Sequence, residues 1–455
     1  MKKLNNQKII KGSLLLTAGA FLSKLLGAIY RIPLTNLLGG EGLGMYQMIF
    51  PVYCVLLDFS GAGAPGAISK LIAEKHGDEQ FSFSVLKGSI KLLSVFGFFG
   101  TLLMCVLSGT LANGQGNPQI KTGYILLAPA VLAVAVISCF RGYFQGKMEM
   151  LPTALSQVIE QVIKLLFGLL LVSAFMPDLK MAVAGATLAV SISELVALLY
   201  LVWTYIRRKK SLKERFSYDR TLFRQNLKKF VKYLVLVTVI GVAIPLSQVV
   251  DSFLIVNILN GYKTDATALY GLYSGAATTV INLPVAVCYG VATVAIPAVS
   301  GAKSMQAKRL NGFRTIFLTL IVAIPCALLC LAFAPLAVRI LFSRLNQLER
   351  EITVSLIRAL SVNVVFLSLL QTENAVLIGS GKPVCALIGM SIGIAVKILL
   401  NIILLPNPSL GIFGAVIGVI ACYFTACLIN LILIIKLKVK NASKEPCGGE
   451  YDHAE

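Results

Sequence analysis

Charged side chains lie inside segments of this sequence that otherwise read as membrane-spanning helices. The stretch FLSKLLGAIYRIPLTNLLGG, which begins at Phe21, carries Lys24 and Arg31 seven residues apart, on nearly one face of a helix. Two cations along a water-filled path suit an anionic ligand, because the planar guanidinium of arginine binds phosphate oxygens in pairs. The alternative is that both side chains extend to the membrane surfaces and bind no substrate.

A second polar face lies in the segment SQVIEQVIK. Glu160 and Lys164 are four residues apart with the acid first, the favoured order for a helical ion pair. Structural pairing of these two residues is therefore one interpretation. Because Gln157 widens the polar face, the other interpretation is a cavity lining, in which Gln157, Glu160 and Lys164 join Lys24 and Arg31 as substrate-binding residues.

Two acids are candidates for coupling transport to a cation, Na⁺ or H⁺. Asp251 lies deep in the segment PLSQVVDSFLI, with no cation within a helical turn. It is either an ion site or the partner of a cation on another helix: Lys24, Arg31 or Lys397. Asp58 precedes the small residues SGAGAPG, where closely packed backbone also allows a hinge. A charge at the bilayer centre costs about 2.5–3.5 kcal/mol, so such residues normally face a bundle interior or a cavity.

The sequence contains no catalytic constellation. It has two histidines, no Walker loop and ten scattered cysteines, which we interpret as apolar packing residues. We therefore expect no enzymatic activity, no catalytic residues, no cofactor and no metal site. Without an ATP motif, transport would depend on an ion gradient, a membrane potential or downhill substrate flow.

The elements that hold these charges are transmembrane helices. Hydrophobic residues make up 57% of the chain and charged residues 13%, against about 25% charged in soluble domains. The mean hydropathy of +0.83 agrees with a polytopic, all-α membrane protein. Twelve segments approach the roughly 20 apolar residues that a spanning helix needs: 13–36, 43–68, 85–110, 122–143, 153–175, 181–205, 233–257, 267–298, 313–335, 353–378, 384–405 and 411–435.

The distribution of Lys and Arg predicts the orientation. With both termini in the cytoplasm, 30 of the 41 Lys and Arg residues fall in inside segments and six in outside loops. The bias also explains the net charge of +21 as a topology signal beside anionic lipids, so no nucleic-acid partner is implied. The basic residues from Arg339 to Arg350 are the exception, and we interpret them as an amphipathic interfacial turn.

The chain divides into two halves that resemble each other. We predict a six-helix lobe over 1–205, a basic cytoplasmic linker over 206–232, a second six-helix lobe over 233–437 and a cytoplasmic tail over 438–455. Gly146 precedes Lys164 by 18 residues, and Gly379 precedes Lys397 by the same interval. Two halves in one orientation, with a cavity between them, are typical of transporters.

Three segments resemble a known family: GAFLSKLLGAIYRIPLTNLLGGEGLGMYQMIFP, GAISKLIAEKHGD and CFRGYFQGKMEMLPTALSQVIEQVIK. They are similar to the multidrug/oligosaccharidyl-lipid/polysaccharide (MOP) exporter superfamily, and within it to the branch of stage V sporulation protein B, whose relatives include lipid II flippases. The resemblance implies a MATE-like bundle of two lobes, alternating access and a glycan on a lipid pyrophosphate. First-helix cations line the cavity of lipid II flippases, and this role would carry over to Lys24 and Arg31. Those flippases add cations in helices two and eight, which this chain lacks in its second and eighth spans, and many relatives have fourteen spans.

These observations favour a flippase for an undecaprenyl-pyrophosphate-linked glycan that acts as a monomer in a bacterial cytoplasmic membrane. The glycan would be a precursor of cell wall, spore cortex or surface polysaccharide. One alternative is a multidrug/cation antiporter of the same superfamily, which predicts cavities dominated by acids. Another is a non-transporting scaffold for sporulation or cell-wall machinery, in which the interior charges would be dispensable.

Overall fold

The structure is a computed structural model, and it describes residues 2–75, 77–211, 218–302 and 304–436. The described residues form helices joined by short turns, with no strand among them. The predicted tail over 438–455 lies outside the described residues. The side chain of Lys24 also lies outside them, although its backbone belongs to the first helix.

The first part of the chain contains seven α-helices and two short helical turns of other types. They are α1 (Lys2–Leu57), the π-helical turn η1 (Asp58–Ala62), α2 (Ala64–Glu74), α3 (Glu79–Gly114), the 3₁₀ turn η2 (Pro118–Ile120), α4 (Lys121–Leu127), α5 (Pro129–Gly146), α6 (Met150–Phe175) and α7 (Leu179–Ser211). Eight further α-helices and one π-helical turn follow. They are α8 (Arg220–Asn260), α9 (Ala266–Gly271), the π-helical turn η3 (Leu272–Ala277), α10 (Thr278–Ser300), α11 (Met305–Leu341), α12 (Gln347–Leu360), α13 (Val362–Gly379), α14 (Pro383–Leu404) and α15 (Phe413–Ile435).

Helix α1 consists of two arms that meet at Gly39. This residue has φ 64° and ψ −170°, a left-handed conformation that favours glycine. In the described part of the chain, eleven segments are long and apolar enough to cross a membrane, and the longest has 57 residues, Ala18–Glu74. At about 1.5 Å per residue this segment is far longer than a hydrocarbon core of roughly 30 Å. The two arms therefore make two crossings, which confirms the prediction of about twelve transmembrane helices.

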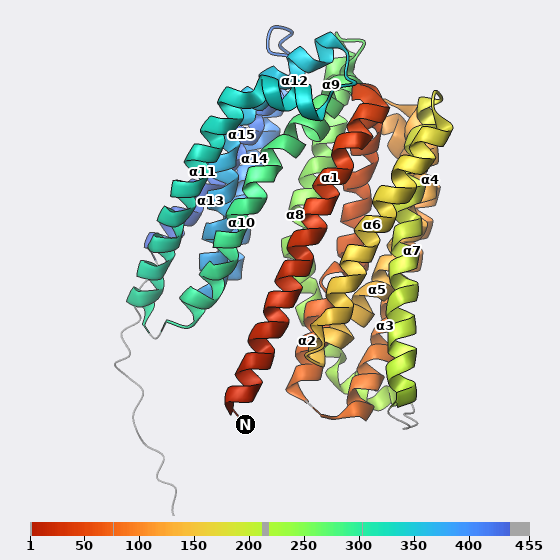
Figure 1. The fold of residues 1–455 in the computed structure, drawn as a ribbon, viewed down its shortest axis with the longest axis vertical. Coiled ribbons are helices and arrows are strands. Elements are labelled where there is room, and N and C mark those ends of the chain that lie inside the picture. Colours follow the sequence, from red (N-terminus) through yellow and green to blue (C-terminus); the bar gives the residue numbers. More distant parts are fainter. Residues whose placement is uncertain (1, 76, 212–217, 303, 437–455) are drawn as a thin grey trace, which may run out of the picture.

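The helices form two groups that meet at one end (Figure 1). Helices α1–α7 make up one group and α10–α15 the other, while α8 packs on α1, α2 and α3 and also on α14. The largest hydrophobic core includes Leu38 and Leu43 of α1 together with Leu272 and Leu356 from the other side, so it joins both groups. Toward the end that carries the N-terminus the groups separate, and each has its own core.

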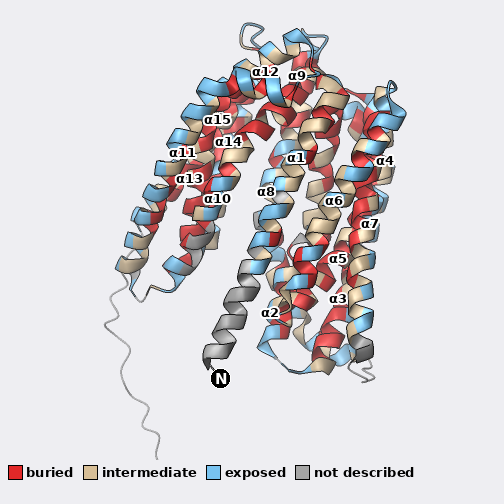
Figure 2. Ribbon diagram, in the orientation of Figure 1, coloured by how far each residue is buried: buried red, intermediate tan, exposed pale blue. Residues whose placement is uncertain are grey.

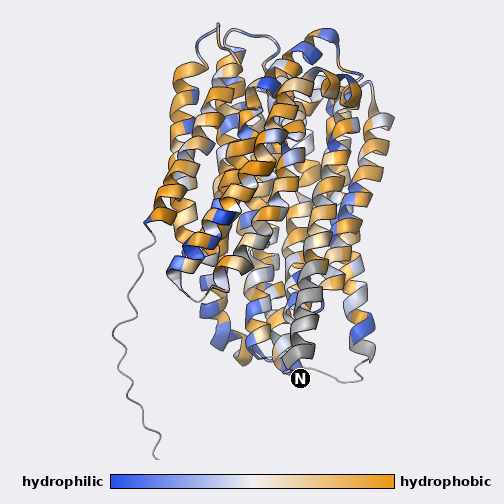
Figure 3. Cartoon of the chain, turned by 60° about the vertical axis from the view of Figure 1, so that its left-hand side comes forward, coloured by the Kyte–Doolittle hydropathy of each residue, from blue (hydrophilic) through white to orange (hydrophobic). Residues whose placement is uncertain are grey.

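The outward faces of the helices suit a lipid environment. Large apolar side chains are exposed along α3 and α11, for example Phe98, Phe99 and Phe317. Buried residues lie between the helices (Figure 2), and hydrophilic residues gather at the helix ends (Figure 3). Because lipid tails are as apolar as these side chains, their exposure fits a membrane and not water.

The internal repeat is visible in the backbone. In the turn between α5 and α6, the amide nitrogens of residues 147, 148 and 149 donate to the carbonyl oxygens of 143, 145 and 144. In the turn between α13 and α14, residues 380, 381 and 382 donate to 376, 378 and 377, the same pattern shifted by 233 positions. Met148 and Gly381 are the corresponding residues with positive φ. Lys164 and Lys397 then occupy equivalent positions of α6 and α14.

Two predicted boundaries differ from the structure. The predicted span 353–378 includes Arg358, but this residue is exposed on α12, a separate amphipathic helix that begins with an Asn346–Glu349 capping box. The amphipathic element expected near Arg350 is therefore longer than a turn, and the next span begins at Val362. The predicted linker is largely helical, because α7 continues to Ser211 and α8 begins at Arg220. The division into two six-helix lobes stays a prediction, since α8 packs on both groups.

Candidate functional site

Two adjoining cavities lie between the two groups of helices. The first, cavity one, has a volume of about 490 Å³ and is lined by residues of α1, α8, α10, α13, α14 and α15. The second, cavity two, has a volume of about 440 Å³ and is lined by α1, α6, α10 and α13. Four residues line both: Arg31, Phe50, Asn282 and Gln371. Both volumes fall within the roughly 300–1,000 Å³ of small-molecule pockets.

Arg31 lies at the junction of these cavities. Its side chain is half-buried and forms no hydrogen bond or ion pair with the residues that the structure describes. Arg31 therefore lines a cavity, the location expected from the sequence, while its role in substrate binding stays a prediction. The neighbours of Lys24 in the chain, Ser23 and Leu25, line cavity two. The corresponding prediction for the Lys24 side chain falls outside the described residues.

The expected ion pair between Glu160 and Lys164 is wrong. Glu160 Oε2 accepts a hydrogen bond from Arg141 Nη2 at 3.0 Å, and Gln161 Nε2 donates to its other carboxylate oxygen at 2.9 Å. Arg141 Nε also donates to the Ser156 hydroxyl at 3.0 Å, which fixes the guanidinium against α6. Because α5 brings a nearer cation to Glu160, Lys164 has no ion-pair partner among the residues that the structure describes.

On the polar face of α6, Lys164 and Gln161 line cavity two. Lys164 is half-buried there and has no ion pair among the described residues. Glu160 and Gln157 line neither cavity. Gln157 Oε1 is buried without a hydrogen-bond partner in the described structure. The cavities therefore give no support to the substrate-binding roles predicted for Gln157 and Glu160.

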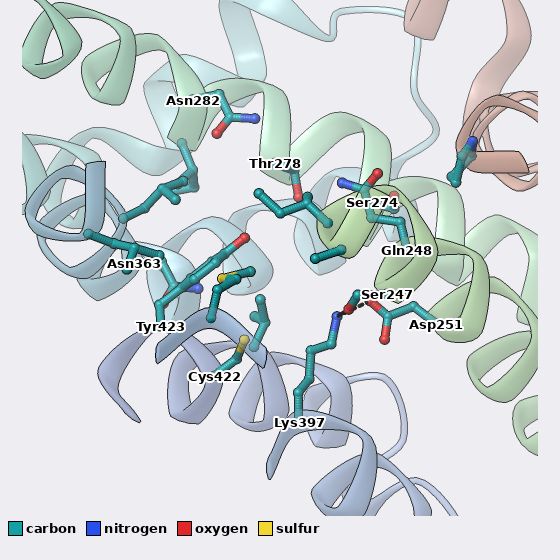
Figure 4. Close-up of a pocket in the computed structure, with 18 of the residues that line it drawn as sticks. Ser247, Gln248, Asp251, Ser274, Thr278, Asn282, Asn363, Lys397, Cys422 and Tyr423 are labelled. Atoms are coloured by element: carbon teal, nitrogen blue, oxygen red, sulfur yellow. Dashed lines mark hydrogen bonds and ion pairs between the residues drawn. The ribbon is translucent and has the colours of Figure 1, made fainter. Parts of the chain in front are cut away.

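Asp251 has a partner on a distant helix. Its Oδ2 lies 2.6 Å from Lys397 Nζ of α14, and its Oδ1 accepts a hydrogen bond from Asn401 Nδ2 at 3.2 Å. The ammonium also contacts the Ser247 hydroxyl, one turn before Asp251 on α8. Both charged side chains are almost fully buried, and they lie against cavity one (Figure 4). Of the two interpretations left open by the sequence, the structure supports the interhelical partner, and it selects Lys397.

Sequence reasoning left the partner of Asp251 open among three cations for a physical reason. Lys397 and Asp251 are 146 residues apart, and no local pattern pairs them. The repeat was the available signal, because it makes Lys397 the counterpart of Lys164 and so places it on an inward-facing position of α14. Ser247 and Asn401 carried no signal of their own, since small polar residues are common in membrane helices.

Asp58 lies away from both cavities. It is the first residue of η1, is half-buried, and forms no ion pair with any described residue. A Cβ atom at Gly241 of α8 would lie 3.2 Å from Asp58 Oδ1, so the carboxylate faces that helix. The backbone leaves α-helical geometry here, with Gly61 at φ 145°. This backbone agrees with the hinge interpretation, and the ion-coupling role of Asp58 stays a prediction.

Positive charges outnumber negative charges among the described residues that line the two cavities. Arg31, Lys164 and Lys397 are the cations, and Asp251 is the only acid among the described lining residues. Since Asp251 neutralises Lys397, two unpaired positive charges remain, both bordering cavity two. Unpaired cations in a site shielded from bulk water attract anions more strongly than they would in water. No group of three His, Cys, Asp or Glu side chains among the described residues is placed to hold a metal ion.

Comparison with known proteins agrees with this architecture. The sequence profile of the polysaccharide biosynthesis protein family matches residues 9–303. The chain belongs to this family. It is 31% identical to stage V sporulation protein B of Bacillus subtilis (strain 168), over 95% of this chain and 86% of the relative. It is 25% identical to the lipid II flippase MurJ of the same strain, over 94% of this chain and 83% of the relative.

Among solved structures, the fold resembles a multidrug resistance MATE family transporter of the MOP superfamily in its inward-facing conformation. The TM-score is 0.77 at 17% identity, over 93% of this chain and 96% of the other. At that identity the likeness concerns the fold alone. The chain is thus a multi-pass membrane protein of the polysaccharide biosynthesis family with the fold of a MOP superfamily transporter. This result confirms the fold class, and the 31% identity to stage V sporulation protein B confirms the family resemblance read from the sequence.

Proposed function

We propose that this protein is a flippase that carries an anionic lipid-linked glycan across the bacterial cytoplasmic membrane by alternating access. The observation that carries the proposal is the presence of two unpaired cations among the described lining residues, Arg31 at the junction of the two cavities and Lys164 in cavity two. A pyrophosphate linker supplies the negative charge that such a site lacks, and arginine can bind two of its oxygens at once. The similarity to a lipid II flippase and to a sporulation protein supports the same substrate class.

The arrangement of the two helix groups supports alternating access. They share a core at one end and have separate cores at the other, so one end can open while the other stays closed. We propose that the separated end, which carries the N-terminus, faces the cytoplasm, as the distribution of Lys and Arg predicts. The substrate would then enter from the cytoplasmic side. We propose that a single protein molecule binds and carries it.

The lipid part of the substrate has a place in cavity two. Phe21 and Leu25 of α1 and Val287 of α10 line this cavity and are exposed. An undecaprenyl chain could therefore leave the cavity sideways between α1 and α10 and remain in the bilayer. The diphosphate would stay at Arg31 and Lys164.

A coupling cation, Na⁺ or H⁺, would act at Asp251. Its two carboxylate oxygens already accept from Lys397 and Asn401, so a cation binding there must displace Lys397. We propose that such competition links ion binding to movement of α14 against α8. The multidrug/cation antiporter alternative predicts unpaired acids in the cavities, and the described lining contains none.

The proposal is tested by binding of undecaprenyl diphosphate to purified variants. Removing one charge-assisted contact of about 1.5–3 kcal/mol should weaken binding about 10- to 100-fold. We expect losses of this size for Arg31→Ala and for Lys164→Ala, and little change for Lys263→Ala, an exposed lysine in the loop after α8. Melting temperature serves as the folding control. A folded Arg31→Ala, Lys164→Ala double variant that binds like wild type would rule out the anion site. Failure of the wild-type protein to flip the lipid in proteoliposomes would favour a scaffold or another substrate.

A further inference from the structure

Four arginines lie close together in the chain at the end where the two helix groups meet (Figure 1). The segment 339–358 contains Arg339, Arg344, Arg350 and Arg358, two glutamates and no lysine. The distribution of Lys and Arg predicts that this end lies outside the cytoplasm, where basic residues are scarce, so a topology signal does not account for the four arginines. None of them lines cavity one or cavity two. These four residues are called the outer arginines.

The two glutamates of the segment do not neutralise the outer arginines. Glu349 is bonded to backbone amides of α1 and of its own capping box, and Glu351 to a glutamine side chain one turn away. Arg339, Arg344 and Arg358 are exposed and form no side-chain hydrogen bond or ion pair with the residues that the structure describes. Arg339 and Arg358 lie in the last turns of α11 and α12, where a cation offsets the helix dipole. Arg344 belongs to neither helix, so the dipole does not account for it.

The turn that carries Arg344 is fastened on both sides. The backbone amide of Arg344 donates to Asn36 Oδ1 of α1 at 3.1 Å. The Arg350 guanidinium, from the first turn of α12, donates to the Ser343 carbonyl oxygen of the same turn. Arg350 Nε is buried without a hydrogen-bond partner in the described structure, so one donor of this guanidinium stays unused. The segment therefore presents unpaired guanidinium groups on a fixed backbone.

Arg339 lies where the lipid-facing side of α11 ends. It follows Ile321 by 18 residues, about five turns of an α-helix, and Leu328 by 11 residues, about three turns, so the three residues share one side. Ile321, Leu328 and the neighbouring Ile340 are each more than half exposed. A helix side of this kind contacts acyl chains, and a cation at its end lies at the level of the lipid headgroups.

We propose that the outer arginines bind the phosphate headgroup of an anionic phospholipid, such as phosphatidylglycerol, in the outer leaflet. Guanidinium groups bind phosphate oxygens in pairs, whereas a lysine offers only a point charge. The acyl chains would lie along the exposed side of α11 that ends at Arg339. An acidic protein would match the charge but would leave this apolar side uncovered. The site is separate from the two cavities and does not depend on the substrate of the proposed function.

The bound lipid would stabilise the closed state of this end. Leu341, two residues after Arg339, accepts a hydrogen bond from Asn36 Nδ2 at 2.7 Å, and the Arg344 amide donates to the other atom of the same amide group. A headgroup held by Arg339 and Arg344 fixes the two segments that hold Asn36. Because a ligand shifts an equilibrium toward the state that it binds better, anionic lipid should favour the closed outer end.

The first test measures lipid binding to the purified full-length protein in detergent. Phosphatidylglycerol should raise the melting temperature more than phosphatidylcholine with the same acyl chains, because a ligand of the folded state stabilises it. The double variant Arg339→Gln, Arg344→Gln should bind phosphatidylglycerol about tenfold more weakly, as loss of a charge-assisted hydrogen bond predicts, and phosphatidylcholine within twofold of wild type. Lys180→Gln, Lys263→Gln is the matched control, because it removes two exposed cations from the same end and should change neither affinity.

Several results would overturn this site. Equal binding of the two lipids by wild type, or wild-type preference in the folded arginine variant, would mean that the outer arginines hold no lipid. Equal stabilisation by inorganic phosphate would indicate a site for the free ion. Arginine-dependent binding of polyglutamate without a preference for phosphatidylglycerol would assign the surface to an acidic protein. The proposed function is tested separately, at Arg31 and Lys164.

The second test measures the state of the outer end. Spin labels on Lys180→Cys of α7 and Ser355→Cys of α12 lie at exposed positions of the two helix groups, in a background without the ten native cysteines. Nanodiscs that contain phosphatidylglycerol should show a several-fold smaller population at long distance than nanodiscs of phosphatidylcholine. With Arg339→Gln, Arg344→Gln the two populations should be equal. If the populations are equal with the arginines intact, the bound lipid does not keep this end closed.

Discussion

Asp251 and Lys397 form a buried ion pair that joins α8 to α14, with Asp251 Oδ2 2.6 Å from Lys397 Nζ. Ser247 and Asn401 complete the hydrogen bonding of the two charges. Removing one member of such a pair costs about 3–5 kcal/mol, because the other charge stays buried without a partner, whereas removing both is often neutral. The pair therefore offers a way to separate a structural role from ion coupling.

We predict that Asp251→Asn lowers the melting temperature of the purified protein clearly, since Lys397 keeps its charge and loses its acceptor. The double variant Asp251→Asn, Lys397→Met should recover most of the loss. Thermal unfolding of the two single variants and the double variant in detergent measures this coupling. If Asp251→Asn instead unfolds like wild type and loses only the dependence of flipping on Na⁺ or membrane potential, Asp251 is a coupling residue and its pairing with Lys397 is weak.

A second prediction separates Glu160 from Lys164, which the sequence had grouped together. Glu160→Gln should lower stability, because it removes the carboxylate that accepts from Arg141 in a half-buried site. Its coupling energy with Arg141→Gln should lie within about 0.5–3 kcal/mol. Lys164→Gln should leave the melting temperature nearly unchanged and weaken binding of undecaprenyl diphosphate. The opposite pattern, a stability loss at Lys164 and a binding loss at Glu160, would reverse the assignment.

These two clusters show what the sequence could and could not predict. The twelve crossings and the inward position of Arg31 followed from apolar lengths and from the cost of a charge in lipid. The partner of Glu160 did not, and the partner of Asp251 stayed open among three cations, because both come from other helices, and packing between helices decides which cation is nearest. The predicted span 353–378 includes Arg358 for a related reason. The apolar residues of the amphipathic helix α12 directly precede those of the next span, so the sequence reads as one longer apolar segment. The repeat, shifted by 233 positions, was the one long-range signal in the sequence.

A third prediction concerns the chemistry of the two first-helix cations. Arg31→Lys should restore only part of the binding of undecaprenyl diphosphate that Arg31→Ala loses, because the charge survives and the two-pronged geometry does not. Lys24→Arg should be tolerated better than Lys24→Ala or Lys24→Glu. Titration of each purified variant with the lipid gives the comparison. Full recovery in Arg31→Lys would mean that the site needs only a positive charge.

A fourth prediction tests the orientation. With the N-terminus in the cytoplasm, a cysteine placed at Ser211 should resist a membrane-impermeant thiol reagent in intact cells and react after the membrane is opened. A cysteine at Thr264, in the exposed loop after α8 at the other end of the bundle, is the control and should react in intact cells. The experiment needs a background without the ten native cysteines. Ready labelling at position 211 in intact cells would reverse the topology and the direction of transport.

The last prediction concerns the end where the two helix groups meet. Glu349 Oε1 accepts from the Gly40 amide at 2.9 Å, and Asn36 Nδ2 donates to the Leu341 carbonyl at 2.7 Å. These bonds tie the tip of α1 to the end of α11 and to α12. Gly271 packs so closely there that a Cβ would lie 2.2 Å from the Gly40 carbonyl oxygen. Opening of this end to the outside must break these contacts.

We therefore expect Glu349→Ala and Asn36→Leu to favour opening toward the outside. In a variant that keeps Cys54, which lines cavity one, and lacks the other nine cysteines, an impermeant thiol reagent added outside should label Cys54 several-fold faster after either substitution. Glu351→Ala is the matched control, because Glu351 accepts side-chain bonds only from within α12 and should leave the rate unchanged. Each lost hydrogen bond contributes about 0.5–1.5 kcal/mol, which shifts a two-state equilibrium about two- to tenfold. Equal labelling of Cys54 in the Glu349 and Glu351 variants would mean that apolar packing, and not these hydrogen bonds, keeps this end closed.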